Sequence, residues 1–280
     1  MSGAAPGSGA APVGGPAPGG EAAIQVRGVS TRFGTQQVHK DLDLTIRRGE
    51  LVALIGGSGS GKSVLLREII GLQRPTGGRI ELLGTDVWNA PEAALTAVRR
   101  RIGMMFQDGA LFSSLTVAGN VATPMREHGG IPRHLIEPLV ELRLAMAGLP
   151  VSAGAKRPSE LSGGMRKRAA IARALALEPE VLFLDEPTSG LDPITARAFD
   201  SLLASLCDDL GITVLIVTHD LDTLLTIARR VVVLGQGRVI ADGPVDEVMA
   251  VDDPWIRSYF SGRRMIGASP SANGNRIDGT

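Results

Sequence analysis

The chain has 280 residues, and its 29 Lys and Arg balance 29 Asp and Glu, so the formal net charge is zero. This balance argues against a nucleic-acid-binding protein, which usually carries a basic excess or a basic stripe. The apolar fraction of 44% excludes a largely disordered chain, and the single cysteine, Cys207, excludes an internal disulfide framework. The longest apolar run, Leu51–Ile55, has five residues, whereas a membrane-spanning helix needs about 20.

Both ends of the sequence differ in composition from its centre. Met1–Gly20 holds seven Gly, five Ala and four Pro and no charged residue, so it has too little apolar surface to offset the entropy of ordering. Arg263–Thr280 is similarly polar and rich in Gly and Ser. We therefore predict a disordered tail over 1–21, an ordered domain over 22–250, and a C-terminal tail over 251–280 that holds a short helix before a flexible end.

Between the tails, short apolar strands alternate with helical patterns. A continuous apolar run such as Leu51–Ile55, which ends in glycines, is typical of a strand buried on both faces. This alternation predicts an α/β fold with a parallel sheet that helices cover on both sides. Strands are predicted at 23–33, 42–46, 51–55, 80–83, 102–105, 181–184 and 213–217, a hairpin at 231–234 and 238–241, and helices at 64–72 and 169–177.

Two further segments repeat apolar residues every three or four positions, which is the spacing of one helical face. The first segment lies between the predicted strands at 102–105 and 181–184. The second follows the strand at 181–184, and its polar residues Asp200, Ser205 and Asp209 are expected on the opposite face. The apolar positions are Leu135, Leu139, Leu142, Met146 and Leu149 in the first segment, and Phe199, Leu202, Leu203, Leu206 and Leu210 in the second.

The turn after the strand at 51–55 carries a phosphate-binding pattern. Gly56–Ser63 fits G-x-x-x-x-G-K-[ST] between a strand and a helix, where glycines and the helix N-terminus direct N–H groups toward phosphate oxygens. Lys62 would reach the outer phosphates and the Ser63 hydroxyl would bind Mg²⁺; the alternative is a chance glycine-rich turn. The predicted ATP-binding residues of this segment are Gly56, Gly57, Ser58, Gly59, Ser60, Gly61, Lys62, Ser63 and Val64.

Two carboxylates follow the predicted strand at 181–184. Ligands of open α/β sheets bind at the carboxyl ends of the strands, so Asp185 and Glu186 are placed to act on a nucleotide. Asp185 could hold the magnesium shell, and Glu186 could polarise the attacking water. An Asp-Glu pair at a strand end is also a common surface feature, but its combination with a phosphate loop favours the catalytic interpretation.

A third motif, Leu161–Met165, reads Leu-Ser-Gly-Gly-Met and precedes an amphipathic helix. The Ser162 hydroxyl and the free N–H groups of Gly163 and Gly164 could face an anion there. Alone, the motif would be interpreted as a capped helix start. Its position 23 residues before Asp185 instead indicates a second nucleotide-contacting segment.

In this order, the motifs make the chain resemble the ATP-binding cassette (ABC) ATPases over roughly Ile24–Val248. Gln107 matches the glutamine between the core and the helical lobe, Ser189–Asp192 resembles the D-loop, and His219 resembles the switch histidine. Phe33, before a glycine, resembles the aromatic residue that stacks on adenine. Each of the three single residues also has an ordinary interpretation: Phe33 as a core residue, Gln107 as a strand-end amide, and His219 as a paired polar residue.

The resemblance implies a P-loop NTPase core with a mostly parallel sheet, an antiparallel β lobe and an α-helical lobe at about Asp108–Ser159. It also implies ATP and Mg²⁺ as cofactors. Two copies would lie head to tail, so that ATP lies between the phosphate loop of one and the signature motif, Leu161–Met165, of the other. Met165 departs from the family, since many members have Gln there, so one polar side chain of the motif is absent. The implied roles are catalytic for Glu186, His219 and Gln107, metal-binding for Ser63, Gln107 and Asp185, and ATP-contacting for Phe33, Ser162, Gly163 and Gly164.

Several segments, some of them outside these motifs, resemble the ATPase of the bacterial lipid-asymmetry (Mla-type) transporters. They include Phe106–Phe112, Val117–His128 and Asp253–Gly262. The resemblance implies an ATPase that energises phospholipid transport from the cytoplasmic face of the inner membrane. Its partners would be a second copy, an integral membrane permease, a periplasmic MCE-class lipid-binding protein and a STAS-domain subunit, with no nucleic acid. The alternatives are another class of transporter and a soluble cassette protein in cluster assembly; the carboxylate pair disfavours a non-hydrolysing scaffold.

Overall fold

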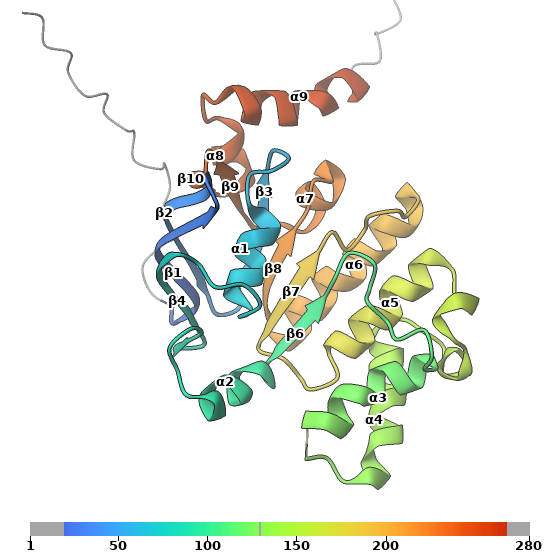
Figure 1. Cartoon of the computed structure of the whole chain (residues 1–280). Helices are drawn as coiled ribbons and strands as arrows, with labels where there is room; N and C mark the ends of the chain where they lie inside the picture. The colour runs from blue at the N-terminus through green and yellow to red at the C-terminus, as the bar shows by residue number, and fades with distance from the viewer. Residues whose placement is uncertain (1–19, 129, 268–280) are drawn as a thin grey trace, which may run out of the picture.

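A computed structural model of the chain describes residues 20–128 and 130–267. Residues 1–19 of the predicted N-terminal tail and residues 268–280 of the predicted C-terminal tail lie outside this part. The described part holds two sheets with helices packed around them (Figure 1). The antiparallel sheet, the core sheet and a group of helices follow one another across the molecule, as the resemblance implies.

The core sheet has six strands in the order β10-β9-β3-β8-β7-β6. All neighbours pair in parallel except β9 and β10, which form the predicted hairpin. The turn of this hairpin places Gln236 and Gly237 at φ values of 52° and 76°, as tight hairpin turns require. The strands are β3 (Leu51–Gly56), β6 (Ile102–Met105), β7 (Val181–Asp185), β8 (Thr213–Val217), β9 (Arg230–Gly235) and β10 (Arg238–Gly243).

The second sheet is antiparallel, with its strands in the order β2-β1-β4-β5. β2 begins six residues before the predicted strand at 42–46. Its first residues are mostly polar and exposed, but they pair with β1 as far as Phe33 opposite Gln36. Backbone pairing extends this strand where side-chain alternation gives no signal. The strands are β1 (Ala22–Phe33), β2 (Gln36–Arg47), β4 (Gly77–Leu82) and β5 (Thr85–Asp86).

Strand β3 joins the two hydrophobic clusters of the protein. All six of its residues are buried. Leu51, Ala53 and Ile55 belong to the cluster that the helices on one side of the sheet complete, whereas Val52 and Leu54 belong to the cluster under the antiparallel sheet. The continuous apolar run is therefore explained by burial on both faces of a parallel strand.

Two helices begin at the predicted nucleotide motifs, earlier than their apolar patterns indicate. α1 (Lys62–Ile69) and α5 (Gly163–Ala174) start two and six residues before the predicted helices at 64–72 and 169–177, and each ends three residues earlier. The first residues of these helices are mostly polar residues or glycine. Apolar periodicity therefore does not mark where the helices begin. In α5 the Ser162 side chain accepts a hydrogen bond from the Met165 N–H at 3.3 Å and caps the first turn.

A group of helices lies beside the core sheet, between β6 and α5 in the chain. The α3 and α4 helices pack on each other and on α5. Before β6 in the sequence, α2 (Glu92–Arg99) lies between β5 and β6. The helices of this group are α3 (Val117–His128), α4 (Arg133–Met146), and two short 3₁₀ helices, η1 (Val151–Ala155) and η2 (Pro158–Glu160).

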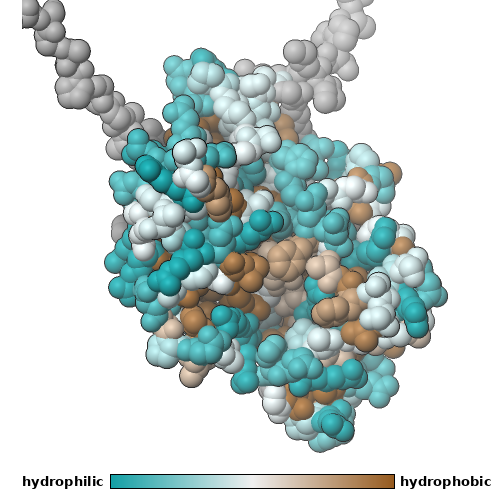
Figure 2. Space-filling view, viewed as in Figure 1, coloured by the Kyte–Doolittle hydropathy of each residue, from teal (hydrophilic) through white to brown (hydrophobic). Residues whose placement is uncertain are grey.

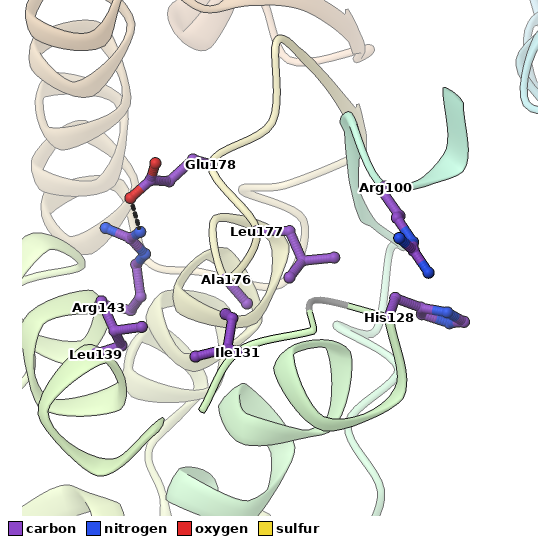
Figure 3. Close-up of a pocket in the computed structure, with 8 residues that line it drawn as sticks. All are labelled: Arg100, His128, Ile131, Leu139, Arg143, Ala176, Leu177 and Glu178. Atoms are coloured by element: carbon purple, nitrogen blue, oxygen red, sulfur yellow. Dashed lines mark hydrogen bonds and ion pairs between the residues drawn. The ribbon is translucent and has the colours of Figure 1, made fainter. Parts of the chain in front are cut away.

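The α4 helix buries only part of its predicted stripe. Leu139 and Met146 pack against the helix-side cluster, and Leu149, just beyond the helix, is buried in it. Leu135 and Leu142 are instead 43% and 48% exposed, whereas Ile136, Val140 and Leu144, outside the predicted stripe, are buried. Apolar residues occur on both sides of this helix, so the spacing alone does not fix its buried face. Arg143 is also buried, and its Nη2 donates to Glu178 Oε1 at 2.5 Å beside a small cavity of about 250 Å³ (Figure 3).

The α6 helix (Pro193–Leu210) confirms most of its predicted stripe but not the place of Asp200. Phe199, Leu203 and Leu206 are buried, whereas Leu210 at the helix end is exposed. Asp200 was expected on the opposite, polar face but is 1% exposed, and it accepts a hydrogen bond of 2.9 Å from Thr223 Oγ1 of α7 (Leu221–Ile227). A single hydrogen-bonded carboxyl can thus stand within an apolar helix contact.

Burial raises the pKa of Asp200 to about 6, and this shift predicts a dependence of stability on pH. A raised pKa favours the protonated form in the folded state, so its stabilising contribution is complete below about pH 4 and is lost as the pH rises through 6. The change in the free energy of unfolding caused by Asp200→Asn should therefore be more favourable by about 2 kcal/mol at pH 7.5 than near pH 4. Urea unfolding at both pH values measures the difference, and exposed Asp209→Asn on the same helix is the control.

The described part of the chain ends in two helices that fold back over the core, α8 (Val245–Met249) and α9 (Pro254–Gly267). The predicted short helix of the C-terminal tail is thus part of α9, which continues into the segment from Arg263 that was expected to be loose. Ile256 and Phe260 are buried in the helix-side cluster. Within residues 20–128 and 130–267, none of the helices has the length and hydropathy of a membrane span.

Candidate functional site

The predicted phosphate loop connects β3 to α1 and has the backbone that the pattern requires. Gly61 has a φ of 98°, and a Cβ atom there would lie 2.4 Å from His39 Nε2. Only glycine fits both conditions. The loop therefore turns tightly into the N-terminus of α1, where free N–H groups and the partial positive charge of the helix favour an anion.

A buried polar group supports this loop from behind. His39 on β2 and Glu68 on α1 are fully buried, with His39 Nδ1 and Glu68 Oε2 3.1 Å apart. His39 Nε2 lies 3.2 Å from the carbonyl oxygen of Gly61, and since a carbonyl only accepts, this nitrogen carries the proton. The Thr31 hydroxyl donates to the other oxygen of Glu68. The antiparallel sheet is thus tied to the phosphate loop by groups that no motif indicated.

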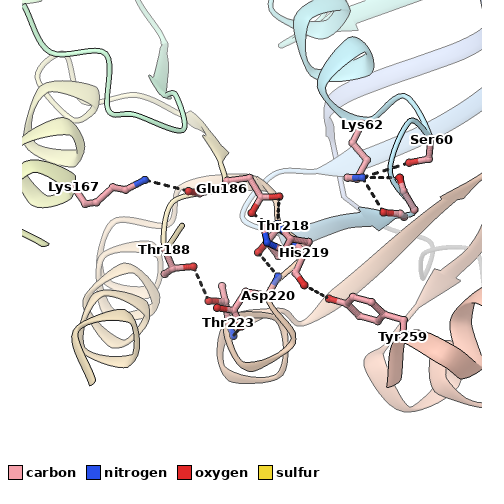
Figure 4. A network of polar contacts seen from close by, with 12 residues as sticks. Ser60, Lys62, Lys167, Glu186, Thr188, Thr218, His219, Asp220, Thr223 and Tyr259 are labelled. Carbon is pink, nitrogen blue, oxygen red and sulfur yellow. Dashed lines mark hydrogen bonds and ion pairs between the residues drawn. The ribbon is translucent and has the colours of Figure 1, made fainter. Parts of the chain in front are cut away.

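Lys62 lies across the loop from which it extends. Its Nζ donates to the carbonyl oxygens of Gly56 at 2.8 Å and Gly57 at 3.1 Å (Figure 4). Burial lowers the pKa of this ammonium group, while the carboxylates of Glu186 and Asp185 oppose the shift. Ser63 and Val64 follow in the first turn of α1, both half-buried.

The remaining predicted loop contacts, Gly57, Ser58, Gly59 and Ser60, line one side of a cavity of about 380 Å³. Its other sides come from the β9–β10 turn and from Trp255 of α9. A Cβ atom on Gly57 would lie 3.2 Å from the Trp255 indole nitrogen, and the Trp255 ring stacks on Tyr259 with 5.0 Å between centroids. These two aromatic side chains thus pack on their own chain, beside the phosphate loop.

The two predicted carboxylates stand at the carboxyl end of β7. Asp185 is half-buried, and burial, followed by the neighbouring charge of Glu186, raises its pKa. Glu186 has a φ of 49°, in the left-handed region that non-glycine residues seldom adopt. Its N–H donates to the Val217 carbonyl at 2.8 Å. This unusual backbone turns the Glu186 side chain toward the end of the neighbouring strand, β8.

At that strand end, Glu186 meets His219. The His219 Nδ1 lies 2.7 Å from Glu186 Oε1, and the His219 N–H donates to Glu186 Oε2 at 3.4 Å. The imidazole is 72% exposed, whereas the Glu186 side chain is 14% exposed. The Tyr259 hydroxyl donates to the His219 carbonyl at 3.3 Å (Figure 4). The structure thus brings together two predicted catalytic residues and adds a contact from α9.

The other predicted residues lie at separate places around the core. Gln107 and Asp108 are exposed in the segment that follows β6, and Phe33, at the end of β1, is 49% exposed. Ser162 is exposed at the start of α5, and Gly163 and Gly164 are half-buried. The start of α5 lies apart from the turn between β3 and α1 (Figure 1), so within one chain the signature and the phosphate loop do not form a single site.

The comparisons with known proteins agree with this arrangement. Residues 39–189 match the family described as ABC transporter. The chain is 39% identical over 243 residues to "Probable ribonucleotide transport ATP-binding protein mkl" of Mycobacterium tuberculosis, covering 87% of this chain and 67% of that protein. It is also 39% identical over 239 residues to "Intermembrane phospholipid transport system ATP-binding protein MlaF" of Escherichia coli, covering 85% of this chain and 88% of that protein.

Solved structures show the same fold. A dimeric bacterial ABC transporter cassette superposes with a TM-score of 0.72 at 33% identity, covering 79% of this chain and 98% of the other. A post-hydrolysis state of that cassette, with ADP and Pi bound, gives a TM-score of 0.71 at 32% identity. Because the family model covers more than half of the chain and a relative is 39% identical over most of it, the chain belongs to the ABC transporter family as an ATP-binding and ATP-hydrolysing subunit.

Proposed function

We propose that this ATPase energises phospholipid transport between bacterial membranes. The observation that carries the proposal is the similarity to proteins named as intermembrane phospholipid transport ATP-binding proteins, over 85% of this chain. A relative of equal identity is named for ribonucleotide transport, so transport of another cargo is the alternative that the experiment below must separate. The soluble role in cluster assembly is the further alternative.

In the proposed ATP complex, the phosphates lie on the loop Gly56–Ser63, with Lys62 on the outer phosphates and Phe33 against the adenine. The residues proposed for Mg²⁺ fit this ion, because Ser63, Gln107 and Asp185 offer hydroxyl, amide and carboxylate oxygens. When bound, the ion would neutralise charge between the outer phosphates.

Glu186 and His219 are proposed to act on the attacking water. The contact of 2.7 Å between them and the low exposure of Glu186 support this role, because a base that is held in one orientation can align a water for in-line attack. Gln107, in the segment after β6, is proposed to take part from the side of the helical lobe.

The active unit is proposed to be a head-to-tail pair. Ser162 is exposed, its two glycines are half-buried, and all three lie apart from the phosphate loop of their own chain, so a second copy can present them to ATP. The dimeric form of the similar cassette supports this arrangement. ATP would favour the closed pair because it contacts both copies there, and a ligand shifts an equilibrium by its differential affinity for the two states.

The membrane partners are proposed to be an integral permease, with a periplasmic MCE-class protein and a STAS-domain subunit in the complete system. The chain would lie at the cytoplasmic face of the inner membrane. A groove of about 1280 Å³ on the helical lobe, lined in part by Leu115, Ile136, Val140 and Val151, supports a permease contact. Exposed apolar residues are also visible on the face shown in Figure 2, and such patches mark interaction surfaces.

A detergent pull-down of the full chain from its own membranes, followed by lipid analysis, tests the proposal. Recovery of a polytopic membrane protein together with tightly held phospholipid is the expected result. One other outcome is recovery of a permease without phospholipid, combined with ATPase activity that candidate ribonucleotide cargo rather than lipid stimulates. This outcome would favour a transporter of another cargo. Recovery of cluster-assembly proteins alone would contradict transport altogether.

A further inference from the structure

The feature that none of the nucleotide motifs explains is a buried lysine on the signature helix. Lys167 stands on α5, five residues after Ser162, and is 7% exposed. Lysine is rarely buried to this extent without partners. Its Nζ donates to two backbone carbonyls, those of Gln107 and of Glu186, the second at 3.2 Å. Figure 4 shows the side chain extending from α5 toward Glu186.

The charge of this ammonium group is stabilised by neutral acceptors and by nearby carboxylates. Burial lowers the Lys167 pKa, and the charges of Asp108, Glu186 and Asp185 oppose this shift. A buried donor that loses its acceptors carries the full cost of desolvation. The ammonium group therefore resists any separation of α5 from the two carbonyls.

One of these carbonyls belongs to a residue under backbone strain. Glu186 keeps its φ of 49°, which costs free energy unless the surroundings hold it. Its carbonyl accepts from Lys167 and from the Ser189 N–H at 3.2 Å, and its N–H is bonded to Val217. Among these three hydrogen bonds, the one from Lys167 comes from a separate helix, α5. The backbone conformation of Glu186 that they hold directs its carboxylate toward His219.

The other carbonyl ties α5 to the segment that follows β6. Arg173, further along α5, donates from Nη2 to the Gly109 carbonyl at 2.8 Å and from Nη1 to the Ala110 carbonyl at 2.6 Å. The helix is thus attached to residues 107–110 by two basic side chains. Of these two, Lys167 also reaches Glu186, so it connects the signature helix, the segment of Gln107 and the backbone of Glu186.

We propose that Lys167 is a positioning residue for hydrolysis. It couples the orientation of the Glu186 carboxylate to the position of the signature helix, α5. This inference rests on the proposed role of Glu186. When a second copy and a permease shift α5 and the Gln107 segment, Lys167 carries that shift to Glu186 through the shared ammonium group. ATP affinity is expected to change little, because the phosphates lie on the loop Gly56–Ser63 and the contact of Lys167 to Gln107 is to the backbone carbonyl, not to the side-chain amide.

The test is steady-state ATPase kinetics of the full chain with Lys167→Met, which keeps the bulk and removes the donor. We expect kcat to fall by about 10- to 100-fold, since a small misplacement of a reacting group can cost about 100-fold, while KM and the ATP Kd stay near the wild-type values. Lys167→Arg, which keeps a charged donor, should restore most of kcat. Exposed Arg166→Met, one residue away, should stay within about twofold of wild type.

Arg173→Met separates positioning of Glu186 from anchoring of the helix, because it removes contacts to the same segment and none to Glu186. It should lower kcat less than Lys167→Met does. In a Glu186→Gln background, Lys167→Met should cause little further loss of kcat, because Lys167 acts through Glu186. Equal losses for the two single variants, a kcat for Lys167→Met close to wild type, or a parallel rise in KM would overturn the inference. An active Glu186→Gln variant would instead show that the proposed role of Glu186 is wrong.

Discussion

Glu186→Gln is expected to leave ATP binding nearly unchanged and to lower kcat by about 10²- to 10⁴-fold, the usual contribution of a positioned general base. The amide keeps the size of the side chain and can still contact His219, but it no longer takes up a proton. The carboxylate lies 2.7 Å from the imidazole and is mostly shielded from solvent, so water cannot easily replace it. Phosphate release at saturating ATP measures kcat, and nucleotide titration measures binding.

Glu92→Gln is the matched control, since Glu92 is an exposed carboxylate on α2 away from both strands of the site. It should keep the activity of the wild type. Hydrolysis by Glu186→Gln within a few-fold of wild type would show that another group activates the water, in spite of the contact between Glu186 and His219.

Lys62→Ala is expected to act on nucleotide binding itself. A hydrogen bond to a charged group contributes about 1.5–3 kcal/mol, so its loss should raise the ATP Kd by roughly 10- to 150-fold. Lys62 Nζ also joins the carbonyls of Gly56 and Gly57, and alanine leaves the loop without this contact. Calorimetric titration with ATP and Mg²⁺ gives the Kd.

Exposed Lys156→Ala in the helical lobe removes one positive charge elsewhere and serves as the control. It should bind ATP as the wild type does, because an exposed charge at that distance is largely screened. An unaltered affinity of Lys62→Ala would mean that the phosphates do not rest on Gly56–Ser63.

The core strands were predictable because burial on both faces leaves a continuous apolar run. Leu51–Ile55 and the run before Asp185 show this directly, and the topology of parallel strands then places Asp185 and Glu186 at the same edge as the phosphate loop. The position of His219 beside Glu186 follows from the pairing of β7 with β8. These residues were therefore predictable in kind and in approximate place.

Other features depend on contacts that leave no periodic signal. The buried face of α4 is set by its neighbours, and its apolar residues lie on two sides, so Leu135 and Leu142 were misplaced. Asp200 is buried because α7 supplies Thr223 as a donor. Lys167 donates to backbone carbonyls, which every residue type has, so no sequence pattern marks its partners. A positive φ is usually indicated by a glycine, but at position 186 the residue is Glu.

The burial of β3 on both faces has a mechanical consequence for the phosphate loop. The loop continues a strand whose side chains are packed alternately into both hydrophobic clusters, and close-packed interiors transmit displacement instead of absorbing it. A displacement of the loop is therefore expected to reach both clusters, which hold the antiparallel sheet on one face of β3 and the helices on the other. The phosphate loop is thus mechanically continuous with both lobes of the cassette.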